Sequence, residues 1–226
     1  MKSLLIIFAK EPTSGQVKTR LCPPLSLEAA AQLYHAFLTD VLEVARRLPR
    51  LSLALAYSPE SAALFFRGLA PPEAHLFPQT GADLGERMHR AFEWAFAAGF
   101  EAVLLRGADT PDLPGEIILE GKAVLESALA QVVLGPSRDG GYYLVGLTRP
   151  QPELFQGPAW STPGVLEETL NWARALSLTV HLLPVWRDID TFPDLEAFLA
   201  RPHAPPLPGW RSHRLARDLL RNLPRN

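Results

Sequence analysis

Residues 102–114 have the sequence AVLLRGADTPDLP, in which an apolar run gives way to a turn with two carboxylates. An apolar run without polar alternation is typical of a strand buried on both faces, as in a parallel sheet. Thr110 precedes a proline and is therefore expected to be extended, which places Asp109 at the tip of the strand. Asp112 then opens the turn into the following helix, where an aspartate can also act as an N-cap.

The same order of apolar strand and amphipathic helix recurs on both sides of this stretch. The first strand is predicted at 4–8, and Ser26 is the expected N-cap of a long helix that reaches about residue 48. Further strands are predicted at 51–57, 74–77, 103–105, 132–134, 142–147 and 178–185. Further helices are predicted at 60–69, 84–98, 116–129, 165–176 and 195–199, with Gly99 closing the second of these. This alternation predicts one α/β domain with a mostly parallel sheet over residues 1–200.

The composition changes at the C-terminal end, where residues 201–226 form a basic arm. Its charged residues are Asp218 and six arginines, at 201, 211, 214, 217, 221 and 225. Prolines at 205, 206 and 208 make its start linker-like, and 211–221 is compatible with a basic helix that has Leu215, Leu219 and Leu220 on one side. Because charge runs are usually solvated faces, we favour an arm packed on its own domain. The alternative is an arm that faces phosphate or bridges the subunits of a homodimer.

Composition and charge narrow the classes of function. The chain has 226 residues, 47% hydrophobic and 20% charged, which is the balance of a soluble globular protein, and its net charge is −2. Such a charge creates no field that demands nucleic acid or a membrane, so we expect neither as a partner. Cys22 is the single cysteine, which excludes an intramolecular disulfide, and no apolar run approaches the length of a bilayer span. These features, with no recognisable leader, predict a cytoplasmic location.

The loop after the first strand, AKEPTSGQVKTRL, contains Lys10, Gly15, Lys18 and Arg20. In an open parallel α/β sheet, ligands bind beyond the carboxyl ends of the strands, so this loop lies where a ligand is expected. Cations suit a di- or triphosphate, and glycine allows backbone N–H groups to approach a ligand closely. The loop matches neither the Walker A nor the GxGxxG pattern. The alternative interpretation is a solvated basic loop.

Carboxylates follow two other predicted strands. Asp109 and Asp112 repel each other, and a divalent cation such as Mg²⁺ or Mn²⁺, which prefers carboxylate oxygens together with substrate phosphates, would remove that repulsion. The late stretch RDIDTFPDL supplies Asp188 and Asp190, which alternate around an isoleucine and are expected to face the same side. We predict that Asp109 and Asp190 bind the metal, with Asp112 and Asp188 as secondary candidates. Turn or cap roles are the alternative for Asp109 and Asp112.

Residues 137–143, SRDGGYY, form another unusual loop. Asp139 can accept a hydrogen bond from a hydroxyl group, and Gly140 and Gly141 leave room for a sugar or base against the backbone, whereas Tyr142 is expected to pack rather than react. These features are compatible with a loop that faces a ligand. A simple hairpin turn is the strong alternative.

Two helix starts also carry candidate residues. In TGADLGERM, at 80–88, Asp83 is an expected N-cap, and Arg87 lies one turn into the helix, where it can reach a phosphate. We place both on the nucleotide side, with a surface arginine as the alternative for Arg87. Thr191 and Asp194 fit a capping box, so Asp194 has a structural explanation.

Six motifs together resemble a bacterial family of little-characterised transferases, whose members are often labelled glycosyltransferases or selenodomain- or arsenosugar-associated transferases. The motifs occur in order and span about residues 3–199: FAKEPTSGQVKTRL, DLGERM, GADTPDLP, SRDGGYYLVGL, LFQGPAWST and DIDTFPDL. The resemblance implies the three-layer α/β/α GT-A fold of nucleotide-diphospho-sugar transferases. KTRL is also similar to the start of the 2-phospholactate guanylyltransferases, and DIDTFPDL to a late motif of the molybdenum-cofactor nucleotidyltransferases.

The resemblance implies roles for the matching residues. Lys10, Lys18 and Arg20 would contact the nucleotide phosphates. Asp109 matches the carboxylate that follows the central strand and holds the metal in GT-A proteins, and Asp190 matches the late metal-binding aspartate.

Asp139 to Tyr142 would line the acceptor or sugar side in such a protein. Asp109 and Asp139 are the candidate catalytic residues, and on the acceptor side the carboxylate of Asp139 can position or deprotonate the acceptor hydroxyl. Family members usually have Cys where this chain has Thr110, so the resemblance implies no thiol role here.

Three hypotheses about function remain open. The first is a metal-dependent transferase that binds a nucleotide diphosphate sugar and passes the glycosyl group to a small acceptor. The second is a guanylyltransferase-like nucleotidyltransferase that acts on an NTP and a small phosphorylated or carboxylated metabolite. The third is a non-catalytic nucleotide-binding or scaffold protein, against which the retained loop aspartates count.

Overall fold

The computed structural model describes residues 1–157, 159–160, 162–201 and 208–222. Its centre is a seven-stranded sheet with the order β3-β2-β1-β4-β6-β5-β7. The strands are β1 (Ser3–Lys10), β2 (Ser52–Ser58), β3 (His75–Pro78), β4 (Ala102–Arg106), β5 (Val132–Pro136), β6 (Tyr142–Leu147) and β7 (Val180–Leu182). The helices are α1 (Leu27–Ala45), α2 (Ala63–Leu69), α3 (Leu84–Ala97), α4 (Gly115–Glu126), α5 (Glu153–Gln156), α6 (Val165–Ala175), α7 (Phe192–Leu199) and α8 (Trp210–Arg221).

β6 runs antiparallel to both of its neighbours, β4 and β5, whereas the other strand pairs of the described sheet are parallel. The predicted α/β class with a mostly parallel sheet is therefore confirmed. One consequence positions the site: the carboxyl ends of β1, β4, β5 and β7 all point to the same edge of the sheet.

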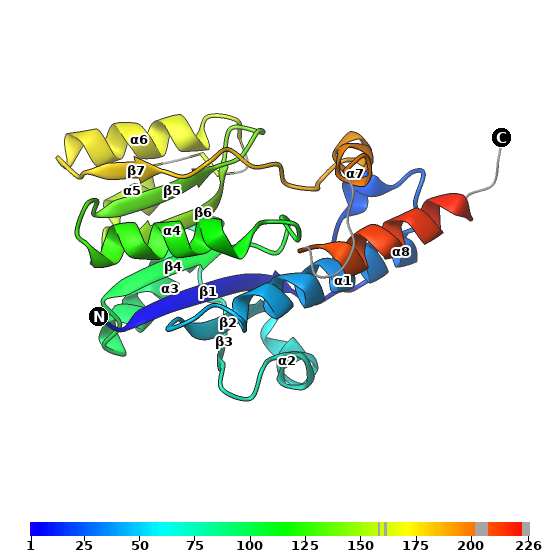
Figure 1. Ribbon diagram of the computed structural model, residues 1–226, viewed down its shortest axis with the longest axis horizontal. Coiled ribbons are helices and arrows are strands. Elements are labelled where there is room, and N and C mark those ends of the chain that lie inside the picture. The colour runs from blue at the N-terminus through cyan, green and yellow to red at the C-terminus, as the bar shows by residue number, and fades with distance from the viewer. Residues whose placement is uncertain (158, 161, 202–207, 223–226) are drawn as a thin grey trace.

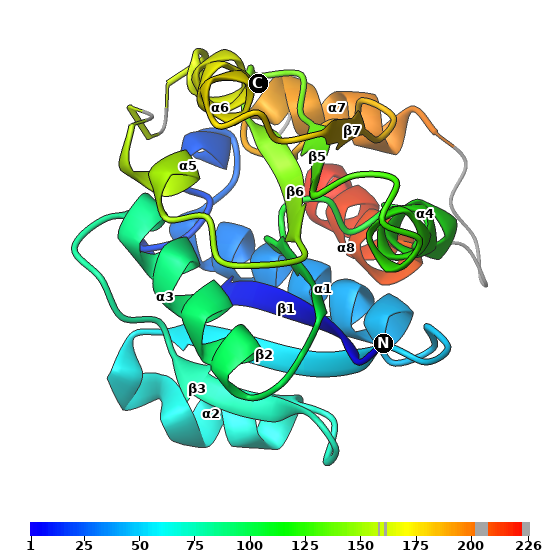
Figure 2. The same cartoon turned by 90° about the vertical axis from the view of Figure 1, so that its left-hand side faces the viewer.

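Two hydrophobic cores cover the two faces of the sheet. Leu5 and Ile7 of β1 belong to the core under α1, α4, α7 and α8, and Leu4 and Ile6 belong to the core under α3, α5 and α6. Figure 2 shows these helices on opposite sides of β1 and its neighbours. All four side chains are at most 1% exposed, which explains why the first strand is apolar without alternation.

The caps predicted at Ser26, Asp83, Thr191 and Gly99 are confirmed. The side chains of Ser26 and Asp83 each accept a hydrogen bond from the backbone N–H three residues on, at the starts of α1 and α3. Thr191 and Asp194 form the capping box of α7, and Gly99 has a φ of 85° just beyond α3.

Several boundaries differ from the prediction. The strand predicted at 178–185 is confined to Val180–Leu182, and Pro184 in its predicted second half has no N–H for a ladder. The helix predicted at 116–129 ends at Glu126, because Ala128 adopts a left-handed φ of 55°. The first helix ends at Ala45 rather than near 48, and the short α5 was not predicted.

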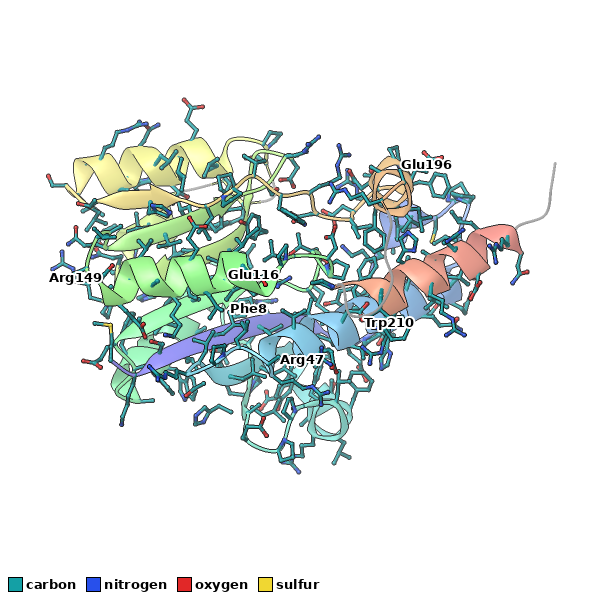
Figure 3. All side chains as sticks on the ribbon, viewed as in Figure 1. Phe8, Arg47, Glu116, Arg149, Glu196 and Trp210 are labelled. Carbon is teal, nitrogen blue, oxygen red and sulfur yellow. The ribbon has the colours of Figure 1, made fainter. Side chains whose placement is uncertain are left out.

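The described part of the C-terminal arm packs on the same chain. α8 lies along α1, with Trp210 at its start (Figures 1 and 3). Leu215, Leu219 and Leu220 contact the core on the α1 face, so the predicted apolar side of this helix is present. The arm's prolines at 205 and 206 and its arginine at 225 lie outside the described residues. Among the helices in the described ranges, none combines the length and apolarity needed to cross a membrane.

Candidate functional site

The carboxyl edge of the sheet brings together loops that lie far apart in sequence. The loop after β1 carries Lys18, the loop after β4 carries Asp109, and the segment after β7 carries Asp188 and Asp190. The backbone N–H of Ile189 donates to the carbonyl oxygen of Asp109, with an N···O distance of 2.9 Å. This bond joins the β4 loop to the segment after β7.

Lys18 is the centre of this arrangement. Its ammonium nitrogen lies 2.5 Å from Oδ1 of Asp109, 2.6 Å from Oδ1 of Asp190 and 5.8 Å from the centroid of the Phe37 ring on α1. The lysine side chain is 5% exposed, whereas the two carboxylates are 43% and 36% exposed. Burial by itself lowers the pKa of Lys18, but the charges of Asp109 and Asp190 raise it above its ordinary value, so the amine stays protonated.

The backbone of the β1 loop holds this ammonium in place. The loop begins where the backbone N–H of Lys10 donates to the hydroxyl of Tyr34 on α1, at 3.0 Å. It ends in a 3₁₀ turn, Thr19–Leu21, whose Leu21 is fully buried. Lys18 precedes this turn with a left-handed φ of 50°, a conformation that costs a non-glycine residue about 1 kcal/mol.

A buried arginine supports the loop that carries Asp109. Arg106, at the end of β4, is 1% exposed and donates from Nη2 to the carbonyl oxygen and the hydroxyl of Thr110, at 2.6 and 2.8 Å. Its Nε donates to the carbonyl oxygen of Gly107, at 3.1 Å. Burial lowers the pKa of Arg106 to about 10, so the guanidinium is still charged at neutral pH. The loop is therefore fixed on both sides of Asp109.

Asp188 is partly buried beside the two carboxylates that contact Lys18. Its Oδ1 atom is buried and has no hydrogen-bond partner among the residues that the structure describes. Burial, together with the charges of Asp109 and Asp190, raises its pKa to about 8. Asp188 therefore shares one electrostatic environment with the two carboxylates that contact Lys18.

Asp112 lies in the predicted turn, but its side chain does not cap the following helix. Its Oδ1 accepts from the indole N–H of Trp186 at 2.9 Å, and its Oδ2 accepts from Arg201 at 3.0 Å. The N-cap position of α4 is occupied by Pro114, without a side-chain cap, so the cap role considered for Asp112 is wrong. The carboxylate instead joins the segment after β7 to Arg201, two residues beyond the end of α7.

The β5–β6 turn contains the residues predicted to line the side of the site where the acceptor substrate binds. Oδ1 of Asp139 accepts from the backbone N–H of Gly141 at 3.1 Å, and Gly140 has a φ of 93°, which favours glycine. Tyr142 packs edge-on against Trp160, and burial raises the pKa of its hydroxyl. This turn is thus a hairpin connection in which Tyr142 belongs to the core on the α3 face.

The remaining predicted phosphate contacts lie around the same edge. Lys10, Gly15 and Arg20 are exposed on the β1 loop, and Gly15 has a φ of 77°. Asp83 caps α3, and Nε of Arg87 donates to a carbonyl oxygen of the loop before that helix, at 3.0 Å. Lys18 thus contacts the carboxylate cluster, whereas Lys10 and Arg20 project from its loop into solvent.

The donor set of the cluster suits a hard divalent cation. Asp109 and Asp190 offer carboxylate oxygens, which Mg²⁺ and Mn²⁺ prefer. Oδ1 of Asp188 has no hydrogen-bond partner among the described residues. In the described ranges, no three or more His, Cys, Asp or Glu side chains converge into a metal-binding group. The Lys18 ammonium lies between Asp109 and Asp190 instead.

Three residues of this region were not singled out from the sequence. Arg106 could have been identified from the sequence, because it is the single charged residue at the end of a strand predicted to be buried. A buried charge needs a hydrogen-bonding partner. Tyr34 and Phe37 had none, since both occupy ordinary apolar positions of a predicted helix.

Comparisons with known proteins agree on the fold. A structure from Desulfovibrio desulfuricans G20, described as a "putative nucleotide-diphospho-sugar transferase", is 33% identical to this chain, covers 100% of it and 99% of its own length, and has a TM-score of 0.88. The 4-diphosphocytidyl-2C-methyl-D-erythritol synthase of Anaerococcus prevotii DSM 20548 matches with 11% identity, 88% and 97% coverage and a TM-score of 0.55. A CMP:2-keto-3-deoxy-manno-octonic acid synthetase in complex with CTP gives the same four values. At 11% identity these two show a shared fold alone, and no curated protein gives a significant match.

The family assignment rests on more than half of the chain. Residues 41–162 match the family described as "Uncharacterized protein conserved in bacteria (DUF2064)". This range contains Asp109 and Asp139, while Lys18 and Asp190 lie outside it, in parts of the chain that the 33% identical structure also covers. The chain therefore belongs to this bacterial family, and its fold is that of the nucleotide-diphospho-sugar transferase-like proteins.

Proposed function

We propose that this protein is a transferase that binds a nucleotide diphosphate sugar at the carboxyl edge of its sheet and passes the glycosyl group to a small acceptor. The observation that carries the proposal is the contact of Lys18 with both Asp109 and Asp190, from three loops at the edge where α/β proteins bind ligands. A cation and two partly exposed carboxylates at this place suit a diphosphate and a divalent ion better than they suit a purely structural role.

Each residue of the cluster has a defined task in this proposal. Asp109 and Asp190 would hold Mg²⁺ or Mn²⁺, with Asp188 as a further carboxylate nearby. When bound, the metal supplies charge neutralisation on the diphosphate leaving group. Lys18 and Arg20 would contact the phosphate oxygens, and the two carboxylates would keep Lys18 protonated for that contact.

The predicted contacts around the cluster complete the proposed site. Lys10 and Gly15, on the exposed part of the β1 loop, would extend the phosphate contacts. Arg87 would approach from the start of α3, which Asp83 caps. Asp139 would orient the acceptor hydroxyl or accept its proton.

The alternative is a nucleotidyltransferase, in which an NTP is attacked at its α-phosphate by a small phosphorylated metabolite. Two exposed cations, Lys10 and Arg20, flank Lys18 on one loop, which is enough positive charge for a triphosphate. Both enzyme classes use the same basic loop and the same carboxylates. They differ in the product: glycosyl transfer releases a nucleoside diphosphate, and nucleotidyl transfer releases pyrophosphate.

A thermal-shift screen tests the shared part of the proposal. NTPs and nucleotide sugars of each base are added with Mg²⁺, with Mn²⁺ or with EDTA. A ligand at 100 times its dissociation constant stabilises the native state by about 2.7 kcal/mol, which moves the melting temperature by several degrees. If no nucleotide shifts the melting curve with either metal, both enzyme assignments lose their support.

The product then separates the two classes. The nucleotide that gives the largest shift is incubated with the protein and a panel of small acceptors, and nucleoside diphosphate and pyrophosphate are measured in parallel. Nucleoside diphosphate release that depends on the acceptor supports glycosyl transfer. Pyrophosphate release from an NTP supports the alternative.

A further inference from the structure

The position of Lys18 has a consequence for the metal. Its ammonium lies 2.5 Å from one oxygen of Asp109 and 2.6 Å from one oxygen of Asp190. Mg²⁺ binds carboxylate oxygens at about 2.0–2.1 Å. An ion bridging these two oxygens would therefore need the space that the ammonium nitrogen occupies, and the two positive charges would repel each other.

The lysine is held in this place by more than its ion pairs. The side chain is 5% exposed, and the ammonium faces the ring of Phe37, which is fully buried on α1. The left-handed backbone at Lys18 and the 3₁₀ turn that follows it direct the side chain inward. Lys18 is thus a resident cation of the cluster rather than a mobile surface lysine.

A phosphate group offers this ammonium another anionic partner. The β1 loop that carries Lys18 also presents Lys10, Gly15 and Arg20 to solvent, so a phosphate bound there lies on the exposed side of the cluster. If Lys18 turns to the phosphate, both carboxylates lose their cation at the same moment.

We infer that Lys18 is a built-in counter-cation that blocks the metal position between Asp109 and Asp190 until a phosphate-bearing ligand draws it away. Nucleotide and metal then bind cooperatively, and the protein holds little metal by itself. This inference rests on the proposed function, because it takes the assignment of the metal to Asp109 and Asp190 from there.

The test uses Mn²⁺ alone, counted by the EPR signal of free Mn²⁺ in titrations of the full chain. Lys18→Met keeps the length of the side chain and removes its charge, so this variant should bind Mn²⁺ at least tenfold more tightly than the wild type. Lys122→Met is the matched control, because Lys122 is also ion-paired and only 12% exposed but lies on α4, paired with Glu126. The control should bind Mn²⁺ as the wild type does. Equal affinity of Lys18→Met and wild type overturns the inference.

A second measurement needs no variant. Lys18 of the wild type should resist acetylation by an amine-specific reagent without metal and should become reactive at millimolar Mn²⁺, as read by mass spectrometry of the Lys18 peptide. Continued protection of Lys18 when Mn²⁺ is bound overturns the inference, because the ion cannot then occupy the place of the ammonium group.

The two proposals fail in different ways. If both Lys18 experiments give the expected result and no nucleotide shifts the melting curve, the transferase assignment fails and the counter-cation role stands. If nucleotides bind with metal and the Lys18 results are negative, the transferase assignment stands and the counter-cation role fails. Asp109→Asn in the Lys18→Met background should abolish the tight Mn²⁺ binding, and its persistence would place the ion elsewhere and overturn the inference.

Discussion

Asp40, a buried carboxylate on α1, accepts hydrogen bonds from both the backbone N–H and the hydroxyl of Ser212 in the first turn of α8, at 2.8 and 2.6 Å. The N-cap position of α8 is Gly209, which has no side chain to serve as a cap. An aspartate from another helix therefore satisfies the first turn of α8, and it also places a negative charge at the positive end of that helix.

Replacing Asp40 should loosen the C-terminal helix. Asp40→Ala leaves a buried N–H and a buried hydroxyl without their acceptor, so the free energy of unfolding should fall by about 2–3 kcal/mol in urea denaturation. Asp218→Ala, on an exposed part of the same helix, should have little effect. Equal stability of Asp40→Ala and the wild type would mean that α8 does not depend on this contact.

Replacing Arg106 should release the loop that carries Asp109. Arg106→Met removes three hydrogen bonds at the end of β4 and leaves two carbonyl oxygens and a hydroxyl in that loop without their donor. We expect a loss of about 3 kcal/mol in the free energy of unfolding, together with weaker Mn²⁺ binding. Thr110→Val, which removes a single acceptor of Arg106, should cost about 1 kcal/mol. A stability loss with unchanged Mn²⁺ affinity would show that the arginine acts on the fold alone.

Replacing Asp112 separates a structural carboxylate from a metal ligand. Asp112→Asn should destabilise the protein, because it weakens the contacts with Trp186 and Arg201, and should leave Mn²⁺ affinity unchanged. Asp109→Asn should leave the stability of the protein nearly unchanged. It should abolish the metal-dependent shift of the melting temperature with nucleotide. Both variants are measured by urea denaturation and by EPR titration with Mn²⁺. If Asp112 is the metal ligand, Asp112→Asn loses Mn²⁺ affinity and Asp109→Asn keeps it.

The buried Asp188 makes stability depend on pH. Its pKa is about 8 in the native state and about 3.9 in the unfolded chain, so the native state binds more protons between these values. The free energy of unfolding must then fall as pH rises from about 4 to 8, by up to about 1.4 kcal/mol per pH unit from this group. Asp188→Asn cannot ionise and should lose this slope.

Urea denaturation at pH 5, 7 and 9 in EDTA measures this effect. The advantage of Asp188→Asn over the wild type should be smallest at pH 5 and largest at pH 9. Parallel pH profiles of the two proteins would show that Asp188 is not buried as a protonated acid.

The elements could be predicted because their signals are local. A strand such as β1 is apolar on both faces, and caps such as Ser26 and Asp83 lie within three residues of their partners. The expected meeting of the loops after β1, β4 and β7 also followed from a general rule, since parallel strands end at one edge. The roles of these site residues in binding and catalysis remain predictions.

The contacts that could not be predicted are long-range. Asp112 was a reasonable cap by its position, and its real partners are 74 and 89 residues away. Lys18 was expected to face a phosphate, and nothing in its loop indicated that two carboxylates would already neutralise it. The local sequence around a residue predicts its backbone conformation. It does not predict which residues from distant parts of the chain will contact its side chain.

The ion pair of Lys18 with Asp190 also bears on how the protein is made. The two residues are 172 positions apart, and the segment that carries Asp190 is also bound to the β4 loop by the hydrogen bond from Ile189 to Asp109. During synthesis the β1 loop therefore leaves the ribosome long before its acidic partners exist. A nascent chain that has folded β1 to β4 holds Lys18 and Asp109 without Asp190, so the complete cluster forms only when nearly the whole chain has emerged.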